Sequence, residues 1–114
     1  MVRILLVEDD YHLSCMVRDW LAELGYEPVG PVPSVKSALE LIANEPLDGA
    51  ILDVSLRNED SYPVADALGE RGVPFVFATG YGASGLAPRF RDTPVLSKPF
   101  LFADVRRAVA RMHA

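Results

Sequence analysis

The chain has 114 residues, of which 50% are hydrophobic and 24% charged, and its formal net charge is -5 at pH 7. This composition is typical of a single globular domain over residues 1–114 and excludes a largely disordered chain. Its acidic balance disfavours general nucleic-acid binding, because phosphate neutralisation requires a basic face. No apolar run is long enough to span a bilayer and no leader pattern precedes the first strand pattern, so we expect a cytoplasmic protein without a membrane partner.

Residues 2–8 form a continuous apolar run that predicts a buried strand. A helix follows and stops at Gly25, and residues 26–32, which contain two prolines, predict an edge strand. Ser34 is the expected cap of a second helix, and residues 47–52 predict a third strand. The side chains expected to be buried are Leu13, Met16, Val17, Trp20, Leu21 and Leu24 on the first helix, and Val35, Ala38, Leu39 and Ile42 on the second.

The second half of the chain predicts a polar loop over residues 55–61, a short helix ending before Gly72, and strands at residues 73–78 and 94–96. Residues 80–93 contain three glycines and a proline, so we expect a short or mobile fourth helix there, and the main conformational change. Expected buried residues are Val64, Ala65 and Leu68 on the short helix, and Phe102, Val105, Val109 and Met112 on the last.

Strands that alternate with helices predict an α/β fold, a doubly wound five-stranded parallel sheet. The flavodoxin-like strand order 2-1-3-4-5 is the natural arrangement for five such units, and ligands then bind at the carboxyl ends of strands one and three. We interpret the last helix's arginines (Arg106, Arg107 and Arg111) as a solvated face rather than a binding patch, and Cys15 as a partly buried structural thiol.

Polar residues follow the expected strands at their carboxyl ends. Glu8, Asp9 and Asp53 would bring three carboxylates together, and their mutual repulsion favours a hard cation such as Mg²⁺. Thr79 and Lys98 add a hydroxyl and an ammonium group that can contact phosphoryl oxygens. Each residue also has a simpler explanation, as a helix start, a turn or a surface charge, but their shared edge favours a metal and phosphoryl site.

The motifs resemble the receiver domain of bacterial two-component response regulators. The matching runs are ILLVEDD at residues 4–10, AILD at 50–53, ATG at 78–80 and SKPF at 97–100. The resemblance implies that Asp53 accepts a phosphoryl group from a histidine-kinase phosphohistidine. It also implies Mg²⁺ ligands in Glu8, Asp9, Asp53 and the backbone carbonyl of Ser55.

Further residue roles come from the same resemblance. Thr79 would move toward the phosphoryl group, Lys98 would pair with it, and the Lys98–Pro99 peptide would be cis. Asn58 stands where glycine is common, which asparagine tolerates because it adopts left-handed backbone angles. Val95 replaces a usual switch aromatic, and Tyr81 is equally compatible with a signalling role and with plain packing.

More narrowly, FATGYG at residues 77–82 with PVLSKPF at 94–100 resembles the single-domain receivers called the FAT GUY family. That resemblance implies that no output domain is attached. It also implies that the partner is a histidine kinase, commonly of the HWE or a related type, or a phosphotransfer protein. The chain would signal by protein contacts or act as a phosphate sink, as a monomer or weak dimer, and would not be an enzyme beyond self-phosphorylation and self-dephosphorylation. The altered region after Thr79 puts the usual output face of helix 4, strand 5 and helix 5 in doubt.

Two other functional classes stay open at this point. A phosphorylation-independent module that regulates a kinase would keep the fold without using the site. A Mg²⁺-dependent phosphatase of the haloacid-dehalogenase kind would use Asp53 as nucleophile, but it needs an acid two residues later, where Ser55 stands. A flavin site is weaker still, because no phosphate-binding loop follows the first strand.

Overall fold

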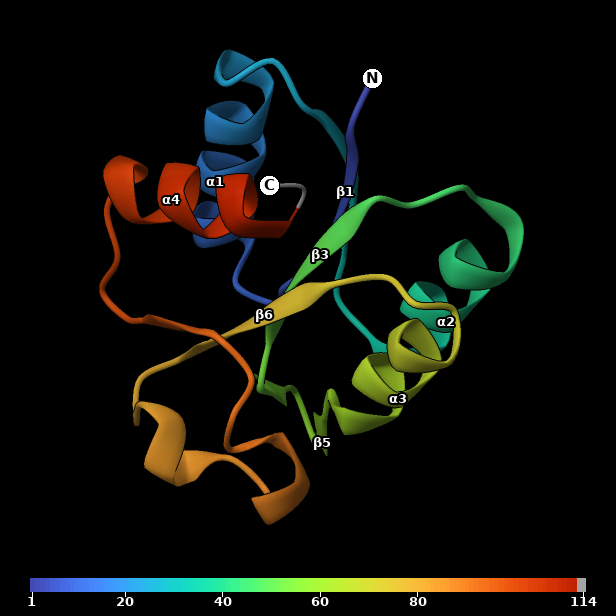
Figure 1. Ribbon diagram of the computed structural model, residues 1–114, viewed down its shortest axis with the longest axis vertical. Helices are drawn as coiled ribbons and strands as arrows, with labels where there is room; N and C mark the ends of the chain where they lie inside the picture. Colours follow the sequence, from blue (N-terminus) through green and yellow to red (C-terminus); the bar gives the residue numbers. More distant parts are fainter. Residues whose placement is uncertain (113–114) are drawn as a thin grey trace.

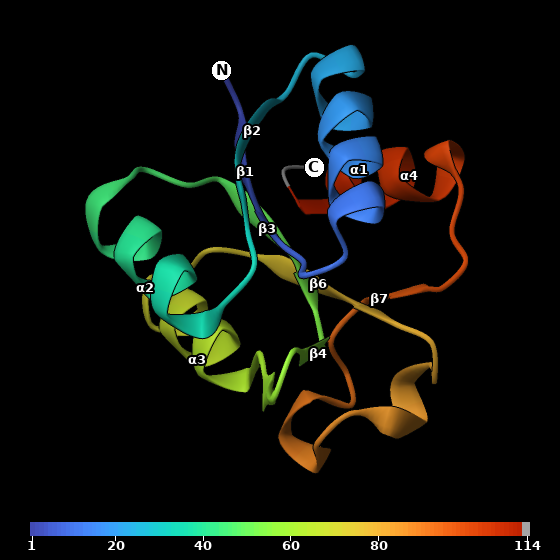
Figure 2. The same ribbon diagram turned by 180° about the vertical axis from the view of Figure 1, so that it is seen from behind.

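The computed structural model describes residues 1–112, apart from the side chain of Ala83, and forms a three-layer α/β fold (Figures 1 and 2). Its parallel sheet has the order β2-β1-β3-β6-β7, which is the predicted order 2-1-3-4-5 when these strands are counted along the chain. Within residues 1–112, no helix is both long and apolar enough to cross a membrane. The strands are β1 (Arg3–Val7), β2 (Glu27–Val32), β3 (Gly49–Asp53), β6 (Phe75–Thr79) and β7 (Val95–Ser97).

Helices cover both faces of this sheet (Figures 1 and 2). Successive residues of a strand point to opposite faces, so Ile4 and Leu6 pack with α1 and α4 while Leu5 and Val7 pack with α2 and α3. The sheet is therefore buried on both sides, as expected for parallel strands. The helices are α1 (Tyr11–Glu23), α2 (Val35–Asn44), α3 (Tyr62–Glu70) and α4 (Phe102–Met112).

Strand β2 lies at the edge of the sheet, as its prolines predict. Its Gly30 has φ +95°, in the left-handed region, and the following peptide bond to Pro31 is cis. A Cβ atom at Gly30 would come within 2.9 Å of the Val32 nitrogen and 3.0 Å of the Leu6 oxygen. Only glycine fits there, because both obstructing atoms belong to the backbone.

Two residues expected on buried helix faces are instead exposed: Met16 is 38% exposed and Leu39 is 37% exposed. On α1 the buried residues include Val17 and Leu21, and Met16 lies about 100° around the helix from Val17. Leu39 stands in the same relation to the buried Ala38 of α2. The apolar stripes predicted from spacing were therefore one residue too wide on each helix.

The predicted polar loop at residues 55–61 contains a small antiparallel hairpin. Its strands are β4 (Ser55–Leu56) and β5 (Glu59–Asp60). Asn58 has φ 63°, which confirms the left-handed conformation expected of it. The loop prediction was wrong because polar side chains do not prevent strand pairing when the turn geometry permits it.

Residues 80–93 contain no α-helix; two single 3-10 turns, Ala83–Gly85 and Pro88–Phe90, take its place. The first half is open to solvent, with Tyr81 81% exposed. The second half is anchored on Tyr62 of α3: the Phe90 ring stacks on the Tyr62 ring at 5.1 Å, and the Ala87 N–H donates to the Tyr62 hydroxyl at 2.8 Å.

Substitutions at the two ends of this segment should therefore differ in effect. We expect Phe90→Ala to lower the free energy of unfolding by about 3 kcal/mol, because it empties a buried aromatic site. Tyr81→Ala should change that free energy by less than about 0.5 kcal/mol, because the ring is exposed. Urea unfolding of both variants measures the difference, and equal effects would show that residues 86–91 are not anchored as described.

Candidate functional site

Four strands of the sheet deliver the predicted polar residues to one edge. Glu8 and Asp9 follow β1, Asp53 ends β3, Thr79 ends β6, and Lys98 follows β7. Because these strands are parallel and adjacent, their carboxyl ends meet at the same side of the sheet. The topology therefore places all five residues of the candidate site near one another.

The three carboxylates form a compact group. Glu8, Asp9 and Asp53 each offer one oxygen, and these oxygens lie within 4.8 Å of one another. The Glu8 and Asp53 side chains are almost fully buried, whereas Asp9 is half-buried. Backbone groups hold the two buried carboxylates: the Asp10 N–H donates to Glu8 Oε1 at 3.0 Å, and the Ser55 N–H donates to Asp53 Oδ1 at 3.2 Å.

Lys98 joins the two buried carboxylates. Its Nζ lies 2.9 Å from Asp53 Oδ2 and 3.4 Å from Glu8 Oε2. The Lys98 N–H donates to the Thr79 carbonyl at 2.8 Å, which fixes the start of the side chain. Burial alone would lower the pKa of Lys98, but the two carboxylates outweigh it and raise that pKa. The Lys98–Pro99 peptide is cis, as the family resemblance implied.

Negative charge remains in excess at this edge. Burial, followed by the neighbouring Asp53 carboxylate, raises the pKa of Glu8 to about 7. A divalent cation would offset the repulsion among the three carboxylates. Clustered carboxylate oxygens are also the ligands that Mg²⁺ prefers. The donor set of Glu8, Asp9 and Asp53 therefore fits the predicted ion, while the role of the Ser55 carbonyl stays a prediction.

Thr79 lies at the same edge of the sheet, at the end of β6. Its side chain is buried, and its Oγ1 accepts a hydrogen bond from the Tyr81 N–H at 3.0 Å. In the described part of the chain, no hydrogen bond joins this hydroxyl to Lys98 or to a carboxylate. The hydroxyl proton is thus available to a further acceptor.

Of the two acids that suit the start of a helix, Asp9 and Asp10, it is Asp10 that caps α1, because its Oδ1 accepts from the Leu13 N–H at 3.1 Å. One feature of the site was not anticipated from the sequence, the contact between Lys98 and Glu8. Two residues 90 positions apart gave no signal for it.

Comparison with known proteins adds an independent finding. The sequence model of the response regulator receiver domain matches residues 4–110. The transcriptional regulatory protein PdtaR of Mycobacterium tuberculosis (strain H37Rv) is 29% identical over 94% of this chain, and the chain spans only 54% of PdtaR. The response regulator receiver protein CpdR of Brucella abortus is 32% identical over 98% of this chain and 97% of its own length.

Solved structures agree with this fold. SdrG from Sphingomonas melonis is 45% identical, with a TM-score of 0.87, over 100% of this chain and 98% of its own. A BeF3-activated conformation of SdrG is 44% identical over 98% of this chain and 96% of its own, with a TM-score of 0.84. The likeness therefore extends over almost the full length of both chains.

The raised pKa of Glu8 predicts a pH dependence of stability in metal-free protein. Between pH 4.5 and about 7 the folded chain holds a proton on Glu8 that the unfolded chain releases. The free energy of unfolding should therefore fall as pH rises through this window. Glu8→Gln should flatten the fall, measured by urea unfolding in a chelator between pH 5 and 8. An equally steep fall in the variant would show that Glu8 is not its source.

Proposed function

This chain belongs to the response regulator receiver domain family of two-component signalling, and we propose that Asp53 accepts a phosphoryl group from a histidine-kinase phosphohistidine. The observation that carries this proposal is the buried Asp53 carboxylate with Lys98 Nζ 2.9 Å away and the carboxylates of Glu8 and Asp9 beside it. A carboxylate in this setting is a nucleophile with a counter-charge already in place for the incoming phosphoryl group.

In the transfer, one Asp53 oxygen forms a bond to phosphorus while the bond between phosphorus and the imidazole nitrogen of the donor breaks. The imidazole leaves with the electron pair of that bond, and the product on this chain is an acyl phosphate. The Ser55 N–H holds Asp53 Oδ1 at 3.2 Å and thereby orients the carboxylate. Lys98 then exchanges its contact with Asp53 for a phosphoryl oxygen.

Glu8, Asp9 and Asp53 would hold Mg²⁺, with the Ser55 carbonyl as a further ligand. The ion, when bound, supplies positive charge that stabilises the phosphoryl oxygens during transfer. Lys98 supplies a second positive charge beside Asp53. The buried Glu8 would take part as a carboxylate, and a bound cation would favour that form because it opposes the burial that raises the pKa of Glu8 in the metal-free site.

Thr79 and the exposed half of the 80–93 segment would change conformation after phosphorylation of Asp53. The Thr79 hydroxyl can donate its proton to a phosphoryl oxygen while Oγ1 still accepts from the Tyr81 N–H. Movement of Thr79 toward Asp53 would then pull on the backbone of Tyr81 and Gly82. The buried Leu86 and Phe90 keep the second half in place, so the rearrangement would be confined to residues 80–85.

The finer assignments rest on the resemblance of the sequence motifs. We assign the chain to the FAT GUY type on its FATGYG and PVLSKPF runs, and in this assignment residues 1–114 would form one receiver domain. Its partner would be a histidine kinase, such as one of the HWE type, or a phosphotransfer protein. The chain would signal by protein contacts or act as a phosphate sink. A cytoplasmic location and a monomeric or weakly dimeric state stay predictions.

The phosphoacceptor role can be tested by intact-mass measurement after incubation with Mg²⁺ and acetyl phosphate. We expect wild type to gain one phosphoryl group and Asp53→Asn to gain none, because the amide is not a nucleophile. Asp60→Asn is the matched control, since Asp60 is an exposed acid in the adjacent hairpin and should leave the gain intact. Removal of Mg²⁺ by a chelator should reduce the gain at least about tenfold.

Other outcomes would point elsewhere. A phosphoryl gain that survives in Asp53→Asn would place the acceptor at another residue. Sustained release of phosphate from many phosphate esters would indicate a phosphatase. Kinase binding that is equal in wild type and Asp53→Asn, with no phosphoryl gain in either, would indicate a phosphorylation-independent module.

A further inference from the structure

One side chain joins the hairpin of β4 and β5, which follows Asp53, to helix α2. The Val35 N–H donates a hydrogen bond to Glu59 Oε2 at 3.0 Å, although the two residues are 24 positions apart. Val35 is the first residue of α2, and its N–H is one of the donors that a helix leaves unpaired at its start. No other hydrogen bond joins the hairpin to α2 in the described part of the chain. The Glu59 carboxylate is therefore the polar link between these two elements.

The start of α2 favours a negative charge that the helix itself does not contain. Ser34 caps the helix, because its Oγ accepts from the Ser37 N–H at 3.2 Å. The first turn has no acidic residue, and the exposed Lys36 lies there. A carboxylate is stabilising at the positive N-terminal end of a helix. Glu59 supplies this carboxylate from a different part of the chain.

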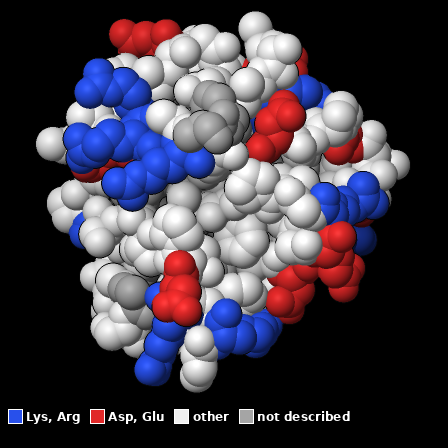
Figure 3. Space-filling view, viewed as in Figure 1, with Lys and Arg blue, Asp and Glu red and all other residues white. Residues whose placement is uncertain are grey.

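The Glu59 carboxylate has no cationic side chain as a competing partner. It takes part in no ion pair among residues 1–112. Lys and Arg side chains gather instead over α4, on the face that Figure 3 shows. Helix α4 packs against one face of the sheet and α2 against the other. The start of α2 is thus the group that orients Glu59.

The same hairpin holds the backbone next to the phosphoacceptor. The Ser55 N–H donates to Asp53 Oδ1 at 3.2 Å, and the Ser55 carbonyl is the predicted further ligand of Mg²⁺. Glu59 lies opposite Leu56 in the hairpin. The Leu56 side chain is buried in the apolar cluster against which Val35 packs. A displacement of Glu59 would therefore reach Ser55 through its neighbour Leu56.

We propose that Glu59 is a positioning residue for the metal and phosphoryl site. Its hydrogen bond to the start of α2 fixes the hairpin, and the hairpin holds the Ser55 backbone against Asp53. Glu59 acts only through this backbone, because it does not belong to the group of three carboxylates that can hold the ion. The inference rests on the proposed function, to which it adds a residue that determines Mg²⁺ affinity. Because coupling between two sites is reciprocal, bound Mg²⁺ should also protect the Val35 N–H from exchange.

Mg²⁺ titration of ¹⁵N-labelled protein, without a phosphoryl donor, tests the role of Glu59. We expect Glu59→Ala to weaken binding about fivefold, somewhat less than the loss of a group that contacts a metal ligand directly. Glu59→Gln keeps an acceptor oxygen and should recover most of the affinity, which separates the hydrogen bond from the charge. Glu40→Ala removes the same charge from an exposed position on α2 and should leave the affinity unchanged.

Val35→Pro removes the donor of the same hydrogen bond and changes no charge. Proline is well tolerated at the first residue of a helix. Ser34 already has the extended backbone, with φ -138° and ψ 160°, that the residue before a proline prefers. The variant should weaken Mg²⁺ binding as much as Glu59→Ala does. The double variant should bind no more weakly than either single variant, because both changes remove one interaction.

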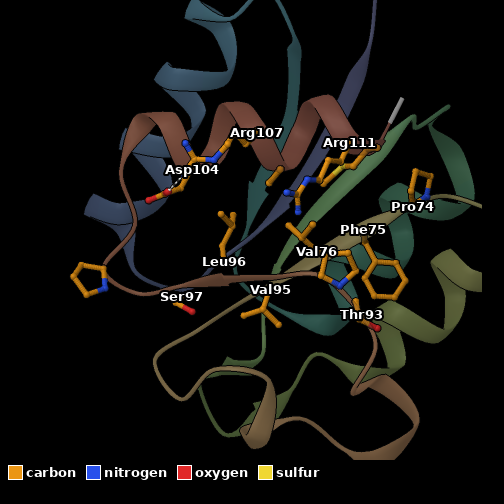
Figure 4. A pocket seen from close by; sticks show the side chains of 14 residues that line it. Pro74, Phe75, Val76, Thr93, Val95, Leu96, Ser97, Asp104, Arg107 and Arg111 are labelled. Carbon is orange, nitrogen blue, oxygen red and sulfur yellow. Dashed lines mark hydrogen bonds and ion pairs between the residues drawn. The ribbon is translucent and has the colours of Figure 1, made fainter. Parts of the chain in front are cut away.

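Amide hydrogen exchange measures the link in metal-free protein. The Val35 N–H should exchange faster in Glu59→Ala than in wild type, because it loses its acceptor. Val76 and Leu96 provide an internal reference. They line a groove of about 790 Å³ between β7 and α4 (Figure 4), to which neither α2 nor the hairpin contributes. A local effect accelerates exchange at Val35 more than at these two residues.

The possible outcomes separate the two proposals. Equal Mg²⁺ affinity in wild type and Glu59→Ala would overturn the role of Glu59 and leave the phosphoacceptor role of Asp53 intact. The expected loss in Glu59→Ala, together with no phosphoryl gain by wild type, would overturn the phosphoacceptor role alone. Equal weakening by Glu59→Ala and Glu59→Gln, or additive losses in the double variant, would show that the hydrogen bond is not responsible. Absence of Mg²⁺ binding by wild type would overturn both proposals.

Discussion

The ion pairs of Lys98 with Asp53 and Glu8 stabilise the carboxyl edge of the sheet, where repulsion between the two carboxylates would otherwise separate them. A parallel sheet brings the carboxyl ends of β1 and β3 side by side, and here both ends carry acids. Burial first, and the neighbouring Asp53 carboxylate second, raise the pKa of Glu8, so the charged form of this pair of acids is disfavoured. Lys98 stays charged, because its pKa is raised, and its charge partly offsets the repulsion between the carboxylates. Its contact with Asp53 can later be exchanged for a contact with a phosphoryl oxygen.

The segment after Thr79, residues 80–93, has an exposed beginning and an end that packs against α3. Its glycine-rich beginning has almost no buried side chain, whereas its end is tied to α3 by the stack of Phe90 on Tyr62. Arg89 reinforces this end, because it lies over both rings and pairs with Asp66 at 2.9 Å. A change at Thr79 would therefore reach Tyr81 without unfolding the neighbouring layer, since low local burial marks the part of a fold that opens first.

The order of the sheet, the edge position of β2 and the meeting of Glu8, Asp9, Asp53 and Lys98 could be predicted, because strand periodicity and parallel topology determine them. The exposure of Met16 and Leu39 could not, since hydrophobic spacing does not reveal how wide a stripe the sheet covers. The anchoring of Phe90 was also missed. The glycines and the proline predicted a short or mobile helix, where the structure has only two 3-10 turns, and they do not reveal a long-range aromatic contact.

The placement of the aromatic residues has a practical consequence for spectroscopy. Trp20, the only tryptophan of the chain, lies against Phe102 in the layer of α1 and α4, with ring centroids 5.9 Å apart. Tyr62 lies in the opposite layer, next to the segment expected to respond. Tryptophan emission would thus report on the layer of α1 and α4 and be insensitive to rearrangement after Thr79. Ring resonances of Tyr62 would show whether the anchored end of the segment, with Phe90, stays in place during that rearrangement.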